Sequence, residues 1–342
     1  MTETVKIWLS GAESTVSAGR SLARTLYGIP LNIRLFGEIG AGKTTFLQGF
    51  ADGLGIRACV RSPTFALEQR YRTHHIGELL HCDMHRLSKR DAQGFLEDTA
   101  SHPGIRCIEW PERVGAVPWS LSPVIDIYFD DTDPHRRSLT IHFSDVPVPD
   151  QEQVQEWRRH MRLPNHIGRH CDAVGAYAAF LAGDLLQRGV LVRPLLLRRA
   201  GELHDLLRFL DFRDGSGPPL SSYDPLDRSV WEEQRARFLS LSHEMACAAF
   251  LEMEGYNAVG RVVRTHGVHL PPDGEVTIEQ KLLFYADKRL KIDELVTLEE
   301  RFQDFRVRYG DDPKSAGWYT QVRNVEQELF PRNAMGSVPP EQ

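Results

Sequence analysis

The stretch Gly37-Glu38-Ile39-Gly40-Ala41-Gly42-Lys43-Thr44 matches the phosphate-loop pattern G-x-x-x-x-G-K-[ST] at every fixed position. Residues 31–36 before it alternate between apolar and polar side chains, as a strand does, and residues 45–51 after it have the pattern of a helix start. In this context the glycines let successive backbone N–H groups turn toward a polyphosphate, and the helix N-terminus adds a positive partial charge. The stretch therefore predicts a nucleotide site.

Two side chains of the loop have distinct expected roles. Lys43 would reach the β- and γ-phosphates, and the Thr44 hydroxyl would bind a Mg²⁺ ion. The alternative is a glycine-rich turn that matches the pattern by chance. The fitting strand and helix on either side favour the nucleotide site over that alternative.

Acidic residues end two further strand-like segments. Asp83 lies in residues 79–87 and Glu109 in residues 105–112. A P-loop ATPase needs a carboxylate for the Mg²⁺ shell and a group that orients the attacking water, and these two residues are the candidates. Taken singly, each would more often be a solvated charge at a strand end. The turn around Thr64 offers hydroxyls that could approach the γ-phosphate, although such a turn is often only a turn.

Composition limits the classes of protein. A chain of 342 residues exceeds the usual size of one hydrophobic core, so we expect two domains. The net charge of −6 excludes a strong basic field for gripping nucleic acid. The N-terminus is not that of a signal peptide and no apolar run is long enough for a membrane span, so we expect a cytoplasmic protein without membrane contact. Five scattered cysteines indicate neither a disulfide framework nor a zinc knuckle.

The first half resembles the TsaE family, the small ATPase of the bacterial machinery that makes threonylcarbamoyladenosine in tRNA. Four segments carry the resemblance, within residues 3–145: 37–46, 62–67, 81–87 and 108–113. It implies a P-loop ATPase with a mostly parallel sheet, ATP with Mg²⁺ as its cofactor, and the partners TsaB and TsaD, with tRNA involved only indirectly. His85 departs from it, because a tyrosine is expected there. Carried over by position, the nucleotide-binding residues are Gly37, Glu38, Gly40, Ala41, Gly42, Lys43, Thr44, Thr45, Thr64 and Trp110; Thr44, Asp83 and Glu109 serve the Mg²⁺, and Asp83 and Glu109 also the catalysis.

A proline-punctuated stretch, residues 144–150, separates the halves of the chain. We expect an ATPase domain at residues 1–146, a linker and connecting helix at 147–162, a second domain at 163–330, and a flexible tail at 331–342. The long segment 211–227 inside the second domain is expected to border a substrate entrance.

Histidines and aspartates occupy apolar, helical settings in the second half. A charged doublet, His204-Asp205, inside so apolar a stretch needs compensation, and a metal ion is the obvious one. Each histidine alone would more often be an ordinary core or surface residue. Mixed nitrogen and oxygen ligands suit Mn, Fe, Co, Ni or Zn. The candidate metal ligands are His170, His204, Asp205, His243, His266 and Asp287.

The same half resembles the HD phosphohydrolase superfamily over about residues 160–310. The resemblance implies an all-α fold in which His170, His204, Asp205 and Asp287 hold one metal and His243 and His266 serve a second. It also implies hydrolysis of a phosphate ester or anhydride by a metal-activated water, with Asp205 catalytic. Weaker candidates for a substrate phosphate are Lys288, Arg289 and Arg208, for which exposed helix charges are the competing interpretation.

Together the two halves indicate a bifunctional protein: an ATPase of threonylcarbamoyladenosine biosynthesis and a metal-dependent nucleotide phosphohydrolase. The expected substrates of the second activity are adenine nucleotides or a modified adenosine monophosphate, by association between fused functions only. Two alternatives remain open: a regulatory protein whose HD domain binds a nucleotide without turnover, and an HD phosphodiesterase acting on cyclic or oligomeric nucleotides.

Overall fold

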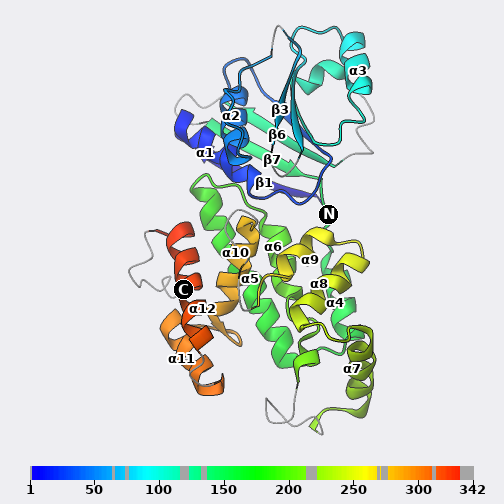
Figure 1. Ribbon diagram of the computed structural model, residues 1–342, viewed down its shortest axis with the longest axis vertical. Helices are drawn as coiled ribbons and strands as arrows, with labels where there is room; N and C mark the ends of the chain where they lie inside the picture. Colours follow the sequence, from blue (N-terminus) through cyan, green and yellow to red (C-terminus); the bar gives the residue numbers. More distant parts are fainter. Residues whose placement is uncertain are drawn as a thin grey trace. The chain divides into compact units, whose positions relative to one another are not determined.

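The structure is a computed structural model (Figure 1) that describes residues 2–63, 66–73, 77–115, 123–131, 137–212, 222–267, 270, 276–309 and 313–331, without the side chains of 308–309 and 313–316. The chain divides into two compact units. The first unit is Met1–Pro147 with Gly183–Arg193, and the second unit is Val148–Ala182 with Pro194–Gln342.

The first unit is built on a seven-stranded sheet with the order β1-β7-β6-β2-β5-β4-β3. The central pairs, β2 with β5, β2 with β6 and β4 with β5, are parallel, whereas β1, β7 and β3 run antiparallel to their neighbours. This confirms the expected α/β domain with a mostly parallel centre. Its strands are β1 (Glu3–Leu9), β2 (Leu31–Phe36), β3 (Glu68–Arg72), β4 (Glu78–Asp83), β5 (Ile105–Glu109), β6 (Val124–Asp130) and β7 (Arg137–Phe143).

Helices α1 (Ala12–Ala23) and α2 (Lys43–Gly53) lie side by side against the sheet (Figure 1). Their apolar residues and those of the strands form one core, in which Leu22, Ile33 and Phe50 are fully buried. Helix α3 (Lys89–Asp98) and the 3₁₀ turn η1 (Pro111–Val114) cover a smaller apolar cluster that includes the inner residues of β4. The parallel strands β4 and β5 therefore have apolar cover on both faces, which explains their nearly continuous burial.

Glycines set the close approach of α1 to α2. A Cβ atom on Gly49 would lie 1.9 Å from the carbonyl oxygen of Val16, and one on Gly19 would lie 2.0 Å from that of Phe46. Both contacts are with backbone, which cannot move aside like the end of a flexible side chain. The two helices can pack at this distance only without side chains at these positions.

We expect Gly49→Ala to destabilise the first unit by about 3 kcal/mol, because the added methyl group must push the two helices apart. The matched control is Gly94→Ala, in the interior of α3, where a Cβ would meet nothing within 4 Å. That change should stabilise by roughly 0.5–1 kcal/mol by restricting the unfolded chain. Denaturant-induced unfolding of the full chain measures both. Equal stability of Gly49→Ala and the parent protein would contradict this helix packing.

A segment from later in the chain completes the first unit. Leu191 is fully buried, and its backbone N–H donates a 2.8 Å hydrogen bond to Ser21 Oγ. Arg193 is 1% exposed and donates two hydrogen bonds, of 2.7 and 2.8 Å, to the carboxylate of Asp145. The first unit thus includes residues 183–193, beyond the contiguous stretch that the sequence indicated.

The second unit is mainly helical. Its elements are α4 (Gln151–His160), α5 (Asn165–Gln187, whose last residues belong to the first unit), α6 (Pro194–Leu203), η2 (Arg208–Asp211), α7 (Pro225–Arg237), α8 (His243–Met253), α9 (Asn257–Val263), α10 (Ile278–Lys288), α11 (Leu298–Tyr309), α12 (Pro313–Leu329), and the small strands β8 (Leu290–Lys291) and β9 (Glu294–Leu295). The hairpin β8-β9 is an exception to the all-helical expectation.

Capping side chains explain where several of these helices begin. Asp150 accepts a hydrogen bond from the Gln153 N–H at the start of α4, and Thr277 forms a capping box with Gln280 at the start of α10. Helix α10 is buried all round, from Ile278 to Lys288. Among the described residues, no helix is both long enough and apolar enough to cross a bilayer.

Candidate functional site

The phosphate loop connects the end of β2 to the first turn of α2. Gly37, Gly40 and Gly42 have φ values of 145°, 82° and 105°, in the region that favours glycine. Gly42 is the N-cap of α2, so the helix starts at Lys43 and directs its first N–H groups toward the loop. The backbone therefore has the form that cradles a phosphate group.

Lys43 reaches back over this loop. Its Nζ donates hydrogen bonds to the carbonyl oxygens of Gly37, at 2.7 Å, and Glu38, at 2.9 Å, and lies 4.1 Å from the centre of the Trp110 ring. Burial lowers the pKa of Lys43, although the carboxylates of Glu109 and its neighbours act in the opposite direction. The ammonium group is thus held where the terminal phosphates of a nucleotide would lie.

The two candidate acids are neighbours across the sheet. Asp83 ends β4 and Glu109 ends β5, and the two are paired in the parallel register. Thr44 Oγ1 donates to Glu109 Oε1 at 3.1 Å, while Asp83 accepts from Ser62 Oγ and the backbone N–H of His85, both at 2.9 Å. The hydroxyl and both carboxylates expected around Mg²⁺ therefore lie at one edge of the sheet.

Trp110 has a left-handed backbone conformation, with φ of 60°. Such a φ is unfavourable for a bulky residue, and residues held in it tend to cluster at functional sites. On the Lys43 side its ring packs against the ammonium group, and the His85 ring lies 4.7 Å away, centroid to centroid. His85, at the position where the family resemblance predicts a tyrosine, thus packs against this aromatic residue.

The sequence pattern did not indicate a role for His81. Its Nε2 lies 2.9 Å from Glu109 Oε1, and its side chain is 1% exposed. His81 precedes Asp83 by two residues on β4, so both side chains leave the strand on the same face. A polar residue two positions before a candidate acid in an apolar strand was the available signal. Of the predicted nucleotide ligands, Thr64 lies outside the described residues.

The second unit brings the six predicted metal ligands together. They come from five places: His170 from α5, the doublet from the turn after α6, His243 from the first position of α8, His266 from the turn after α9, and Asp287 from α10. We name this set of six residues the His–Asp cluster. Two triads within it have ligand atoms mutually within 4.8 Å: His170, His204, Asp205, and Asp205, His243, His266. Asp205 belongs to both triads.

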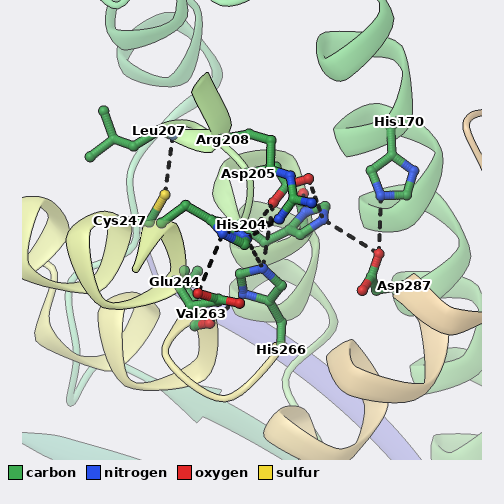
Figure 2. A network of polar contacts seen from close by, with 12 residues as sticks. His170, His204, Asp205, Leu207, Arg208, Glu244, Cys247, Val263, His266 and Asp287 are labelled. Carbon is green, nitrogen blue, oxygen red and sulfur yellow. Dashed lines mark hydrogen bonds and ion pairs between the residues drawn. The ribbon is translucent and has the colours of Figure 1, made fainter. Parts of the chain in front are cut away.

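The outer nitrogen of each histidine in the cluster is anchored. Figure 2 shows part of the cluster from close by, with His170 facing Asp287. Nδ1 of His170, His204 and His266 donates to the carbonyl oxygens of Ile292, Gly201 and Val263, at 2.7, 2.7 and 2.6 Å. Nδ1 of His243 lies 2.5 Å from Asp211 Oδ2. Because a carbonyl oxygen only accepts, Nδ1 carries the hydrogen in at least three rings. This is the arrangement that leaves Nε2 to a metal ion.

The inner nitrogens face the two aspartates. His243 Nε2 lies 3.0 Å and His266 Nε2 3.5 Å from Asp205 Oδ1, while His204 Nε2 lies 3.8 Å from Asp205 Oδ2. Asp287 Oδ1 lies 3.0 Å from His170 Nε2 and 3.7 Å from His204 Nε2. Within the described residues, His204 Nε2 is buried and has no hydrogen-bond partner. A buried polar atom in that condition fits a metal ligand.

The charges of the cluster depend on each other. Burial alone would lower the pKa of His204, but the Asp205 carboxylate raises it well above its usual value. Burial alone would raise the pKa of Asp205 and of Asp287, but His204 and Lys288, respectively, hold these two pKa values well below the usual range. A metal ion at this place would take over the role of the protons on the histidines.

The three weaker phosphate candidates differ from one another. Lys288 is buried, and its Nζ donates to Asp287 Oδ2 at 2.5 Å and to the His266 carbonyl oxygen at 2.9 Å. Arg289 is also buried and donates to Val296 O and Tyr285 Oη. Both cations thus bind within their own unit, and neither is an exposed helix charge. Arg208 differs from both: its side chain is 35% exposed, and its Nη1 lies 2.9 Å from His243 Nε2.

Two carboxylates beside the cluster were not predicted. Asp211, at the end of η2, and Glu244, one residue after His243, lie 2.5 Å and 3.3 Å from His243 Nδ1. Asp211 begins the long segment 211–227, most of which, residues 213–221, lies outside the described residues. Neither carboxylate has a spacing that distinguishes it from an ordinary surface acid.

Comparisons with known proteins concern the first unit. The family model described as "Threonylcarbamoyl adenosine biosynthesis protein TsaE" matches residues 9–139. A Nostoc sp. protein named tRNA threonylcarbamoyladenosine biosynthesis protein TsaE is 37% identical over 131 residues, which are 37% of this chain and 80% of that protein. Its namesake from Aquifex aeolicus is 36% identical over 110 residues, 32% of this chain and 77% of that protein. The crystal structure of Bacillus subtilus YdiB matches 42% of this chain and 88% of its own, at 25% identity, with a TM-score of 0.35.

Proposed function

We propose, from the premise that this chain belongs to the TsaE family, that its first unit is an ATPase of threonylcarbamoyladenosine biosynthesis. The family match, residues 9–139, includes the phosphate loop, both acids and Trp110. The observation that carries the ATPase role is the meeting of Lys43, Thr44 and Glu109 at the end of β2 and β5. Cleavage of the terminal anhydride of ATP needs a phosphate cradle, a metal and a positioned water.

The residues of the nucleotide site in the first unit then have separate roles. The loop N–H groups and Lys43 bind and orient the phosphates, and Trp110 packs against the lysine. Thr44 and Asp83 would hold Mg²⁺, which screens phosphoryl charge. Glu109 orients the attacking water and accepts a hydrogen bond or a proton from it. By family membership we also propose TsaB- and TsaD-like partners, with tRNA an indirect one.

For the second unit we propose a metal-dependent phosphohydrolase with the HD type of site. The observation that carries it is the set of anchored histidines, whose Nε2 atoms meet two aspartates and include one buried nitrogen without a hydrogen-bond partner. One or two divalent transition metals would be held by the His–Asp cluster. A bound metal would supply an activated water and neutralise phosphoryl charge.

This chain's own residues would then position the substrate. Arg208 would bind a phosphoryl oxygen, since it is beside His243 and part exposed. Asp211 would keep the His243 ring oriented. We propose adenine nucleotides or a modified adenosine monophosphate as substrates, by association with the first unit.

The test is a turnover screen of the full chain with Mn²⁺, Co²⁺ or Zn²⁺ and a panel of nucleoside mono-, di- and triphosphates, cyclic nucleotides and dinucleotides. Release of phosphate or nucleoside that is lost on Asp205→Asn and kept in Lys43→Met supports a separate phosphohydrolase. Binding of nucleotide without any product would favour a regulatory module. Cleavage of only cyclic or oligomeric nucleotides would instead identify a phosphodiesterase.

Asp211→Asn should weaken metal binding by roughly 10- to 100-fold, because the neutral amide is a poorer partner for the His243 ring. Glu252→Gln is the control, as Glu252 is on the same helix as His243 and pairs with Arg264 at the surface. The measurement is a titration of each full-length variant with Mn²⁺, in which electron paramagnetic resonance gives the concentration of free Mn²⁺ and hence the dissociation constant. Equal affinities of both variants would exclude an orienting role for Asp211.

A further inference from the structure

We propose that His81 is a positioning residue for the ATPase, which holds one oxygen of Glu109 so that the other faces the attacking water. The inference rests on the proposed ATPase function. Its basis is a buried pair: His81 Nε2 and Glu109 Oε1 are 2.9 Å apart, and the two side chains are 1% and 4% exposed. A hydrogen bond to a carboxylate in such a place is strong and fixes direction.

The two ring nitrogens of His81 differ in their surroundings. Within the part of the chain that the structure describes, Nδ1 is buried and has no hydrogen-bond partner. Nε2 faces a carboxylate oxygen, which accepts. The hydrogen therefore belongs on Nε2, because a buried N–H at Nδ1 without a partner would be costly. His81 donates to Glu109 from this one nitrogen.

The hydrogen bonds to the Glu109 side chain all end at Oε1 among the described residues. Thr44 Oγ1, at 3.1 Å, and His81 Nε2 both reach that atom. When ATP and Mg²⁺ bind, the Thr44 hydroxyl is required by the metal. His81 then remains as the donor that keeps Oε1 in place. With Oε1 held, Oε2 is the oxygen left to orient the water.

The strand geometry makes this tether rigid. His81 is on β4, whose register pairs it with Cys107, two residues before Glu109 on β5. The histidine thus approaches Glu109 diagonally across two hydrogen-bonded strands, and both backbones are fixed in the sheet. A contact between two neighbouring parallel strands leaves little freedom to misplace the carboxylate.

The experiment compares His81→Leu with His81→Gln in the full chain, with Mg·ATP as the probe. His81→Leu removes the donor, and kcat should fall about 10- to 100-fold while KM changes less than about threefold. In His81→Gln the amide Nε2 can replace the ring donor, and we expect most of the activity to return. His102→Leu is the matched control: His102 has a 4% exposed side chain, its Nε2 bonds the Glu78 carbonyl oxygen at 3.1 Å, and its kcat should stay at the parent value.

A second measurement does not depend on turnover. In ¹⁵N-histidine NMR spectra His81 should carry its hydrogen on Nε2, and Glu109→Gln should shift that nitrogen signal. If kcat falls equally in His81→Leu and His102→Leu, and His81→Gln does not restore it, His81 has only a structural role. If the Nε2 signal does not shift in Glu109→Gln, the proposed hydrogen bond from His81 to Glu109 is wrong. If the parent protein shows no ATP turnover, alone or with its TsaB- and TsaD-like partners, the ATPase proposal fails, and this signal still decides whether the tether exists.

Discussion

Replacing Asp205 by asparagine should empty the metal positions of the His–Asp cluster and abolish phosphohydrolase activity. Asp205 is the one residue common to both triads, with Oδ1 toward His243 and His266 and Oδ2 toward His204. Asparagine keeps the shape but removes the charge that attracts the ion. Because loss of an outer-shell partner alone costs about 10- to 100-fold in metal affinity, loss of a shared ligand should cost more than about 100-fold.

Metal analysis of the purified full-length variant by mass spectrometry measures the loss, and phosphate release measures the activity. Glu252→Gln is again the control for removing a carboxylate from the second unit. ATP hydrolysis by the first unit should be unchanged in Asp205→Asn. Full metal content in Asp205→Asn, with a protein that unfolds at the parent temperature, would contradict a metal centre built on this residue.

Replacing Lys43 by methionine should lower ATP turnover about 100- to 1,000-fold, the typical loss for one preorganised donor in an active site. Methionine keeps much of the length and removes the ammonium group. In the structure Lys43 Nζ also donates hydrogen bonds to the carbonyl oxygens of Gly37 and Glu38. Because the variant lacks these hydrogen bonds, we expect its phosphate loop to be more mobile. Affinity for Mg·ATP should fall together with kcat.

Lys6→Met is the matched control, because Lys6 lies over Trp8 at 4.7 Å, as Lys43 lies over Trp110. It removes a cation from an aromatic face in the same unit but away from the phosphate loop. Phosphate release from ATP and a thermal unfolding curve should be recorded for both variants. Unchanged turnover in Lys43→Met would show that the loop does not bind the reacting nucleotide in the way proposed.

The parts of the nucleotide site that could be predicted follow from local sequence patterns: a contiguous motif and acidic residues at strand ends. The phosphate loop is contiguous in sequence, and its glycines have the positive φ values that such a loop requires. Asp83 and Glu109 could be assigned to one edge of the sheet, because the carboxyl ends of parallel strands meet there. His81 could not be paired with Glu109 in the same way, since that contact depends on strand order and register, and a single sequence determines neither.

The second site shows a different limit. Residue type alone predicts its candidate ligands, but three of the four histidines are anchored by backbone carbonyl groups, and no pattern of side chains in the sequence indicates these contacts. Helix α6 ends at Leu203, so His204 and Asp205 lie in a turn, whereas the apolar run predicted a continuous helix. The burial of Lys288 and Arg289 could not be read from periodicity, because α10 is enclosed on every side.

The return of residues 183–193 to the first unit has a practical consequence for anyone who divides this protein into pieces. A fragment cut after Pro147 would keep Asp145 but lose the guanidinium of Arg193, and it would lack the buried Leu191. Such a fragment would carry an uncompensated acid and a bare apolar patch where a neighbour has been removed. The first unit is therefore made of two separate stretches of the chain, and a fragment that is to contain all of it must include both.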